Sequence, residues 1–130
     1  MAMAGHWDVA VVGGGIFGLA CAYNCARRGL RVALFEKGRV GGAASGGIVG
    51  AMAPHVPELW NPKKQFQFEA LSSADAFWSE VDAASGLPSG FGRIGRLVPV
   101  TEERGLELAL SRVQGAAELW GGRFDWRHLP

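Results

Sequence analysis

A glycine motif between two short apolar segments constrains the fold of this chain more than any other feature. The motif has the form G-x-G-x-x-G, with Gly13, Gly15 and Gly18 directly after the apolar run Val9–Val12. A mostly β-branched run without polar alternation is typical of a parallel strand buried on both faces. Between a strand and a helix, the first glycine permits a tight turn, the second lets the backbone approach a pyrophosphate, and the third allows close helix–strand packing. The stretch therefore predicts a strand that leads into a dinucleotide-binding turn.

A helix and a second strand are expected to follow the motif. Apolar residues recur at helical spacing from Ile16 to Ala26, and Gly29 follows as the residue that ends the helix. Residues 30–35 then form a second apolar run, and Glu36 stands at its end. An acidic side chain about 20 residues after the glycines accepts hydrogen bonds from a ribose diol and repels a 2′-phosphate. The pattern favours a β-α-β unit that binds a dinucleotide other than NADP. The alternative is a β-α-β unit whose glycines serve packing alone. In that case the spacing of the three glycines and the position of Glu36 would be coincidental.

A second glycine-rich segment, KGRVGGAASGGIVGAMAP, occupies residues 37–54. A plain NAD-binding unit would pass from the acidic residue into its next helix, whereas this segment has few side chains that could form a core. Such a loop is compatible with a compact fold when its backbone amides find partners on a ligand. We expect residues 41–47 to run close to a pyrophosphate or a flat ring, because glycine backbone approaches without steric obstruction. A flexible surface loop is the alternative, and the apolar continuation at residues 48–52 argues against it.

These features resemble the flavin-dependent amino acid oxidases of the D-amino acid oxidase, glycine oxidase and sarcosine oxidase superfamily. The resemblance rests on VVGGGIFG at residues 11–18, on Glu36, and on GGAASGGIVGAMAPH at residues 41–55. It implies FAD as the cofactor and an oxidoreductase that moves a hydride from a carbon bearing an amine to flavin N5. The fold it implies is α/β: a Rossmann-like FAD-binding βαβ unit with a parallel sheet, followed by the start of an α+β substrate domain.

The resemblance also implies which residues contact the cofactor. The loop at residues 13–18 would hold the pyrophosphate, Glu36 the adenosine ribose, Lys37 and Arg39 would lie beside the adenine half, and residues 43–48 would approach the diphosphate and the flavin. No catalytic and no metal-binding residue is assigned to this chain. The expected cofactor-binding set is Gly13, Gly15, Ile16, Phe17, Gly18, Glu36, Lys37, Arg39, Ala43, Ala44, Ser45, Gly47 and Ile48.

The glycine segment departs from some members of the family, which carry threonines or further hydroxyls there. This chain has Gly42, Ala43 and Ala44 instead, so backbone amides and Ser45 must do more of the work. No Ser/His/Asp or paired-carboxylate arrangement is visible, in agreement with a reaction in which the flavin performs the chemistry. His55, just after this segment, is the one titratable group singled out as a candidate for a catalytic role, although a structural or exposed histidine is the commoner case.

The second half of the chain predicts further helices and strands. Asn61 and the proline after it indicate a helix start, and a helix is expected over residues 61–85. We expect a strand over residues 94–100, restricted to a sheet edge or strand end by its proline. A helix capped by Thr101 is expected to run through residue 120, and residues 124–129 are expected to begin another strand.

The expected domains are a FAD-binding Rossmann-like part at residues 1–90 and the beginning of a substrate-binding domain at residues 91–130. Members of the resembling family are considerably longer than 130 residues. The first strand of a doubly wound sheet sits centrally, so two strands alone would leave edges unpaired. We therefore expect a truncated product or one chain of a larger assembly, completed by a missing C-terminal portion or a partner chain.

Composition excludes some partners and leaves others open. With 13 basic and 12 acidic side chains, the net charge of +1 gives no electrostatic reason for binding nucleic acid or an anionic membrane. No apolar run approaches the roughly 20 residues that cross a bilayer, and the first residues lack a signal-peptide pattern, so a cytoplasmic protein is expected. Cys21 and Cys25 lie four apart on the expected first helix without further ligands, and we expect them to be buried against the sheet.

Two functional hypotheses from different classes remain. The first is the N-terminal, FAD-binding part of an oxidoreductase that acts on a small-molecule amino acid or amine. A flavin 2-hydroxy acid or glycerol-phosphate dehydrogenase is a variant of it. The second is a non-catalytic dinucleotide-binding module, or a subunit that needs a partner to complete its site. Nothing in the sequence identifies the substrate.

Overall fold

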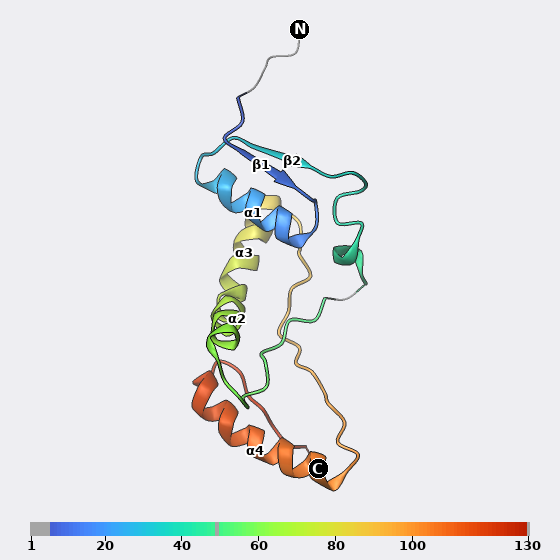
Figure 1. Cartoon of the computed structure of the whole chain (residues 1–130), viewed down its shortest axis with the longest axis vertical. Helices are drawn as coiled ribbons and strands as arrows, with labels where there is room; N and C mark the ends of the chain where they lie inside the picture. The colour runs from blue at the N-terminus through green and yellow to red at the C-terminus, as the bar shows by residue number, and fades with distance from the viewer. Residues whose placement is uncertain (1–5, 49, 130) are drawn as a thin grey trace. The chain divides into compact units, whose positions relative to one another are not determined.

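The computed structural model describes residues 6–48 and 50–129, which form two compact units divided between residues 51 and 52. Figure 1 labels the strands and α-helices of both units. The first unit contains β1 (Val9–Val12), α1 (Ile16–Arg27), β2 (Val32–Phe35) and a short 3-10 turn, η1 (Ala44–Gly46). The second unit contains α2 (Pro62–Ser72), α3 (Ala74–Ser85) and α4 (Glu103–Trp120).

The first unit is built on a parallel pair of strands. β1 and β2 pair in register from Val9 opposite Val32 to Val12 opposite Phe35, and α1 forms the crossover and packs on both strands. This confirms the β-α-β unit expected from the glycine motif. β2 begins two residues later than the apolar run at residues 30–35 suggested.

The ends of α1 follow the glycines. Gly13 has a φ of 107°, a conformation that side chains rarely adopt, and it makes the tight turn after β1. Gly29 has a φ of 81° and follows the end of α1, as its place in the sequence predicted. The two glycines therefore set the turn before the helix and the turn after it.

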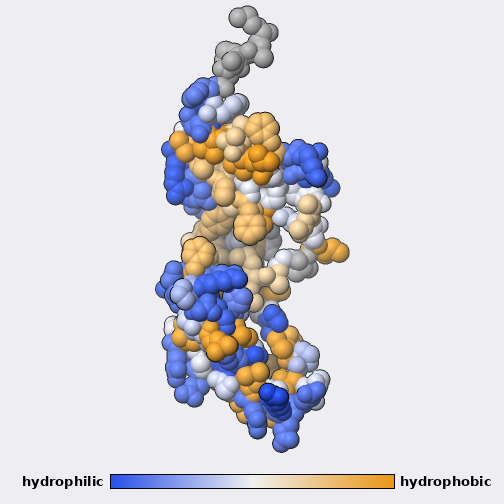
Figure 2. All heavy atoms as spheres, viewed as in Figure 1, coloured by the Kyte–Doolittle hydropathy of each residue, from blue (hydrophilic) through white to orange (hydrophobic). Residues whose placement is uncertain are grey.

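The first unit leaves much apolar surface uncovered. Val12 on β1 is 86% exposed and Phe17 on α1 is 87% exposed, and hydrophobic residues are open on the visible face of both units (Figure 2). β1 alternates between half-buried and exposed residues, so the expectation of a strand buried on both faces is wrong for the described residues. The physical reason is that α1 packs on one face of β1 while β2 pairs along its edge, so in the described residues of this unit no element covers the other face.

The start of α2 agrees with the sequence. Pro62 is the first helical residue, and the Asn61 side chain accepts a hydrogen bond from the backbone N–H of Lys64 at 3.1 Å. Asparagine at this position gives an acceptor to an amide that the helix itself cannot satisfy, and proline needs no acceptor there.

The predicted single helix over residues 61–85 is wrong, because the chain forms α2 and α3 with Ser73 between them. The backbone of Ser73 has φ −91° and ψ −3°, and its hydroxyl donates to the carbonyl oxygen of Ala70 at 2.8 Å. A serine hydroxyl that bonds a nearby helical carbonyl competes with the regular ladder and bends the helix. The apolar spacing continues across Ser73, so the pattern alone did not reveal the break.

α4 ends as predicted and starts differently. Gly121 has a φ of 54° and follows Trp120, the last helical residue. The expectation that Thr101 caps the helix is wrong, because Glu102 is the N-cap residue and no side chain bonds the first amides there. The observed N-cap, Glu102, lies one residue after the predicted one, Thr101, and assigned helix ends commonly differ by one or two residues.

The two predicted strands of the second half, residues 94–100 and 124–129, are also wrong. Neither segment pairs with another strand in the described part of the chain. Ile94 is 97% exposed and Leu97 is 83% exposed. A strand needs a neighbour for its backbone hydrogen bonds, and these described residues have none.

An aromatic cluster forms the core of the second unit. Phe68, Ala116 and Trp120 are buried in it, and partly buried tryptophan and phenylalanine side chains pack against them. The ring of Phe68 meets that of Trp60 edge-on at 5.9 Å and that of Phe124 at 5.8 Å. Edge-to-face contacts at this spacing add to the stabilisation from burial. Trp120 is 2% exposed, whereas Leu110 and Val113 on the same helix are 49% and 38% exposed.

Candidate dinucleotide site

Glu36 lies at the carboxyl end of β2 with its carboxylate between two backbone amides. Oε2 accepts a hydrogen bond from Gly14 N at 2.7 Å, and Oε1 accepts one from Gly38 N at 2.8 Å. These donors, Gly14 first, hold the pKa of Glu36 below its usual value. A carboxylate oxygen has two lone pairs, so each oxygen can still accept a hydrogen bond from a ribose hydroxyl.

The third glycine of the motif lies against the turn that the first one makes. A Cβ atom at Gly18 would stand 1.8 Å from the carbonyl oxygen of Gly13 and 3.4 Å from Cγ1 of Val11. Only glycine fits there, as the expected role in helix–strand packing requires. Gly13 N donates to the carbonyl oxygen of Phe35 at 2.8 Å and ties the turn to β2.

The second glycine segment folds back onto the first. Gly41 N donates to the carbonyl oxygen of Gly14 at 2.8 Å, and Ser45 Oγ accepts a hydrogen bond from Ile16 N at 2.9 Å. A Cβ atom at Gly46 would stand 2.5 Å from the carbonyl oxygen of Gly41, so the turn between them admits only glycine. The two segments that sequence analysis assigned to one ligand are therefore in direct contact.

The predicted cofactor-binding residues all lie in the first unit, in two groups. Gly13, Gly15, Ile16, Gly18, Glu36 and Ser45 are brought together around the start of α1 by the contacts above. Phe17, Lys37, Arg39, Ala43, Ala44, Gly47 and Ile48 are exposed residues of the same unit.

Two residues at the centre of this network, Gly14 and Gly41, lie inside the predicted segments but were not in the expected cofactor-binding set. Gly14 donates to Glu36 and accepts from Gly41, and a Cβ atom on Gly14 would stand 3.1 Å from that of Glu36. A glycine at the variable position of the motif was the available signal for Gly14. The signal for Gly41 was its place at the start of the glycine-rich segment 41–47, which was expected to approach a pyrophosphate.

The residues present fit a ligand with a diphosphate group. The amides of Phe17 and Gly18, in the first turn of α1, have no acceptor in the part of the chain that the structure describes. Free amides and the positive dipole end at the start of a helix favour an anion. A Cβ atom at Gly13 would meet no atom within 4 Å, so the turn is open there, and Glu36 stands beside this helix start as an acceptor.

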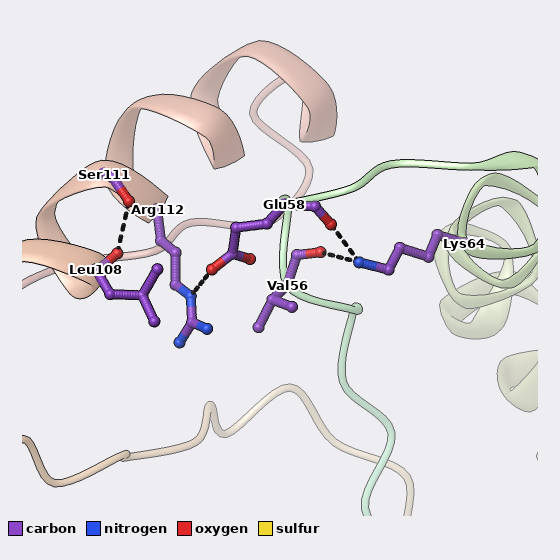
Figure 3. Close-up of polar contacts among 6 residues, drawn as sticks. All are labelled: Val56, Glu58, Lys64, Leu108, Ser111 and Arg112. Atoms are coloured by element: carbon purple, nitrogen blue, oxygen red, sulfur yellow. Dashed lines mark hydrogen bonds and ion pairs between the residues drawn. The ribbon is translucent and has the colours of Figure 1, made fainter. Parts of the chain in front are cut away.

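A polar cluster in the second unit has a different character. Figure 3 shows Arg112 of α4 donating from Nε to Oε1 of Glu58, and Lys64 of α2 donating to the carbonyl oxygens of Val56 and Glu58. Burial alone would raise the pKa of Glu58, but the hydrogen bond from Arg112 and the nearby charges bring the pKa below its usual value. The Arg112 guanidinium also lies 5.0 Å from the centre of the Trp126 ring. These contacts join α2, α4 and the segment before α2, and we assign them to stability.

The cysteines and His55 acquire no chemistry from the fold. Cys21 is exposed and Cys25 is partly buried, so the expectation that both are buried against the sheet is wrong for Cys21. One helix against two strands leaves that side of α1 uncovered. Within residues 6–48 and 50–129, no group of three or more histidine, cysteine, aspartate or glutamate side chains could hold a metal ion. His55 is exposed.

None of the helices in the described residues combines the length and the apolar character needed to cross a bilayer.

Strand, glycine turn, helix, second strand and terminal acid together define a dinucleotide-binding βαβ unit of the Rossmann type. The sequence profile of the FAD dependent oxidoreductase family matches residues 8–129. The chain therefore belongs to this family, whose cofactor is FAD, and the resemblance stated from the sequence is confirmed.

Individual relatives match shorter stretches. A glycine oxidase of Geobacillus kaustophilus is 46% identical over 50 residues, which cover 38% of this chain and 13% of the relative. A glycine oxidase of Bacillus licheniformis is 37% identical over 70 residues, covering 54% and 19%. A thiamine thiazole synthase of Desulfosudis oleivorans is 40% identical over 96 residues, covering 68% and 36%. The chain spans less than a fifth of the length of these glycine oxidases. No solved structure matches the chain.

Proposed function

We propose that this chain forms the FAD-binding part of an oxidoreductase that oxidises a small-molecule amino acid or amine. The observation that carries the proposal is the Glu36 carboxylate, held by the amides of Gly14 and Gly38 beside the start of α1. Membership of the FAD dependent oxidoreductase family supports the cofactor, and the glycine oxidases among the relatives support the substrate class.

In this proposal the residues of the first unit bind and orient the cofactor. Glu36 accepts hydrogen bonds from the ribose diol, and the open amides at the start of α1 donate to the diphosphate. Lys37 and Arg39 lie beside the adenine half, and residues 43–48 approach the flavin. When bound, FAD would supply the electron acceptor for hydride transfer from a substrate carbon bearing an amine to flavin N5. No residue of this chain is proposed to transfer a proton.

The proposed division of the chain follows from the same assignment. Residues 1–90 belong to the FAD-binding part, and residues 91–130 begin the substrate-binding domain. Recognition of the substrate then lies largely with residues that a longer protein or a partner chain provides.

A second candidate is a dinucleotide-binding subunit that is not catalytic by itself and needs a partner to complete its site. The exposure of Val12 and Phe17 on the first unit favours it, because exposed apolar surface of this kind is usually covered in an assembly. A flavin 2-hydroxy acid or glycerol-phosphate dehydrogenase remains a variant of the first candidate, since the FAD site alone does not select the substrate.

The test is an absorption spectrum of the purified chain after incubation with FAD and gel filtration. We expect flavin bands to elute with the protein, and we expect Glu36→Ala to lose them while the matched variant Glu69→Ala, on α2, retains them. Glycine, sarcosine and a panel of D-amino acids are then assayed for bleaching of the bound flavin without oxygen. A chain that retains no FAD would contradict the proposal, and retention without bleaching by any substrate would favour the second candidate.

A further inference from the structure

α4 carries an apolar stripe that the described residues leave open to solvent. The stripe occupies every third or fourth position along the helix, and its residues are Leu106, Leu110, Val113 and Ala117. Leu110 is 49% exposed and Val113 is 38% exposed, whereas Ala116 and Trp120 on the adjoining face are 1% and 2% exposed. An alternation of three and four residues is the spacing of the seam along which two helices pack. The open stripe is therefore suited to a second helix.

A polar stripe with charges of opposite sign at its two ends runs beside the apolar one. It consists entirely of exposed residues, which are Arg104, Glu107, Ser111, Gln114 and Glu118. Arg104 lies in the first turn of α4, and Glu118 lies in the last turn, where it accepts a hydrogen bond from Gln114 Nε2 at 3.0 Å. Within the part of the chain that the structure describes, no ion pair engages Arg104 or Glu118. Both charges are therefore available to pair across an interface.

A hollow lies beside one end of the apolar stripe. Its volume is about 410 Å³, and it is lined by Val113 and Ala117 of α4 and by residues of the segment 122–127. Ala117 is a small residue next to this space, while the other end of the stripe carries the larger Leu106. One end of the stripe can therefore receive the kind of side chain that the other end supplies.

We propose that α4 packs antiparallel against α4 of a second copy of this chain, along the open stripe. A two-fold axis between Leu110 and Val113 places each of them opposite the other across the interface. Leu106 then lies opposite the partner's Ala117 and fills the hollow beside it. This contact occurs twice, because a two-fold axis makes the two ends of the interface equivalent.

The charges select the antiparallel direction. In this register Arg104 of each copy lies beside the partner's Glu118. In a parallel pair Arg104 would face the partner's Arg104, and like charges across an interface are unfavourable. The dipoles of the two helices also oppose each other in the antiparallel pair, which is the favourable direction. All of these residues lie in the second unit, so the inference does not depend on the proposed FAD site.

The test is sedimentation equilibrium of the full chain. One helix and one hollow form a small interface, so we expect a monomer–dimer equilibrium with a dissociation constant in about the micromolar range or weaker. Leu110→Glu places a carboxylate in the seam on each copy and should weaken the dimer at least about tenfold, because burial of an unpaired charge is unfavourable.

Leu108→Glu is the matched control for that substitution. Leu108 is 42% exposed and stands two residues before Leu110, which places it on the other side of α4. The control adds the same charge to the same helix outside the seam. It should change the dissociation constant of the dimer by less than about threefold.

Charge reversal tests the direction of the helices with exposed residues alone. Arg104→Glu sets like charges beside each other twice in the dimer and should weaken it about threefold to tenfold at low salt, a difference that added salt should reduce. The double variant Arg104→Glu/Glu118→Arg restores both pairs with the signs exchanged. Its dissociation constant should return to within about twofold of the wild-type value.

Every other outcome counts against the dimer. A chain that stays monomeric at all concentrations would overturn the proposal and leave the stripe to a different partner. Equal weakening by Leu110→Glu and Leu108→Glu would overturn it, as would failure of the double variant to restore the dimer. Polydisperse aggregates that ignore these substitutions would show non-specific association and overturn it too. Retention of FAD is measured separately, so failure of the dimer and failure of the proposed function are distinguishable.

Discussion

Replacing Gly18 with alanine tests the close approach of α1 to the glycine turn. The new Cβ atom would stand 1.8 Å from the carbonyl oxygen of Gly13, whereas real Cβ atoms essentially never come within 3.0 Å of such an atom. The opposing atom belongs to the backbone, so no side chain can rotate away and the helix or the turn must move. Overpacking of this kind costs about 3 kcal/mol at the upper end of the usual range.

A second effect works in the opposite direction. Gly18 is the third residue of α1, and alanine is favoured over glycine inside a helix by about 1 kcal/mol. Combining the two effects gives a net loss of about 2 kcal/mol in the free energy of unfolding of Gly18→Ala. Displacement of the first helical amides should also weaken FAD binding in this variant.

The assay is urea denaturation of the purified chain, followed by far-ultraviolet circular dichroism. Gly38→Ala is the matched control, because the nearest atom to its new Cβ is Glu36 Oε1 at 3.6 Å, an ordinary contact. The control should stay within about 0.5 kcal/mol of the wild type. A Gly18→Ala variant as stable as the wild type, or more stable, would refute the proposed packing of α1 against Gly13.

Three further predictions follow from other parts of the structure. The pKa of Glu36 is depressed in the folded chain, so the contribution of this carboxylate to stability is complete above the unfolded pKa of 4.5 and is lost as pH falls through the lower folded pKa. FAD should be released over the same acid range, which a fluorescence titration would detect, and Glu36→Gln should remove that step. Asn61→Ala removes the acceptor of the Lys64 amide and should cost about 1 kcal/mol of unfolding free energy, measured by urea denaturation, with Asn61→Asp retaining most of it. Trp120→Ala empties a position that is 2% exposed and should cost about 3 to 5 kcal/mol, and an unchanged denaturation midpoint would mean that the aromatic cluster is not a core.

The parts of the fold that sequence predicted are those governed by local rules. The turn at Gly13, the end of α1 at Gly29 and the cap at Asn61 each depend on a few neighbouring residues with strong conformational preferences. The same is true of Glu36, whose place follows from the length of one helix and one strand. Such features can be read without knowledge of the rest of the molecule.

The parts that sequence missed depend on partners distant in the chain. Residues 94–100 have the composition of a strand, but no neighbouring strand among the described residues completes a ladder with them. At the break between α2 and α3, the Ser73 hydroxyl donates to the carbonyl oxygen of Ala70, and the apolar pattern does not reveal this hydrogen bond. In the candidate site, the bond between Ser45 and Ile16 joins two segments that sequence could assign to one ligand but could not place in contact.

The hydrogen bonds from Gly14 and Gly38 to the Glu36 carboxylate have a consequence for how cofactor preference can evolve. The acid expected to exclude a 2′-phosphate is also the hydrogen-bond acceptor of the Gly14 amide. A single substitution that removes the carboxylate, such as Glu36→Arg, therefore also removes the acceptor of the Gly14 amide in the turn that we propose holds the diphosphate. One side chain is therefore expected to serve both ligand selectivity and the structure of the turn. A variant with a basic side chain at position 36 would need a second substitution that provides a new acceptor for the Gly14 amide.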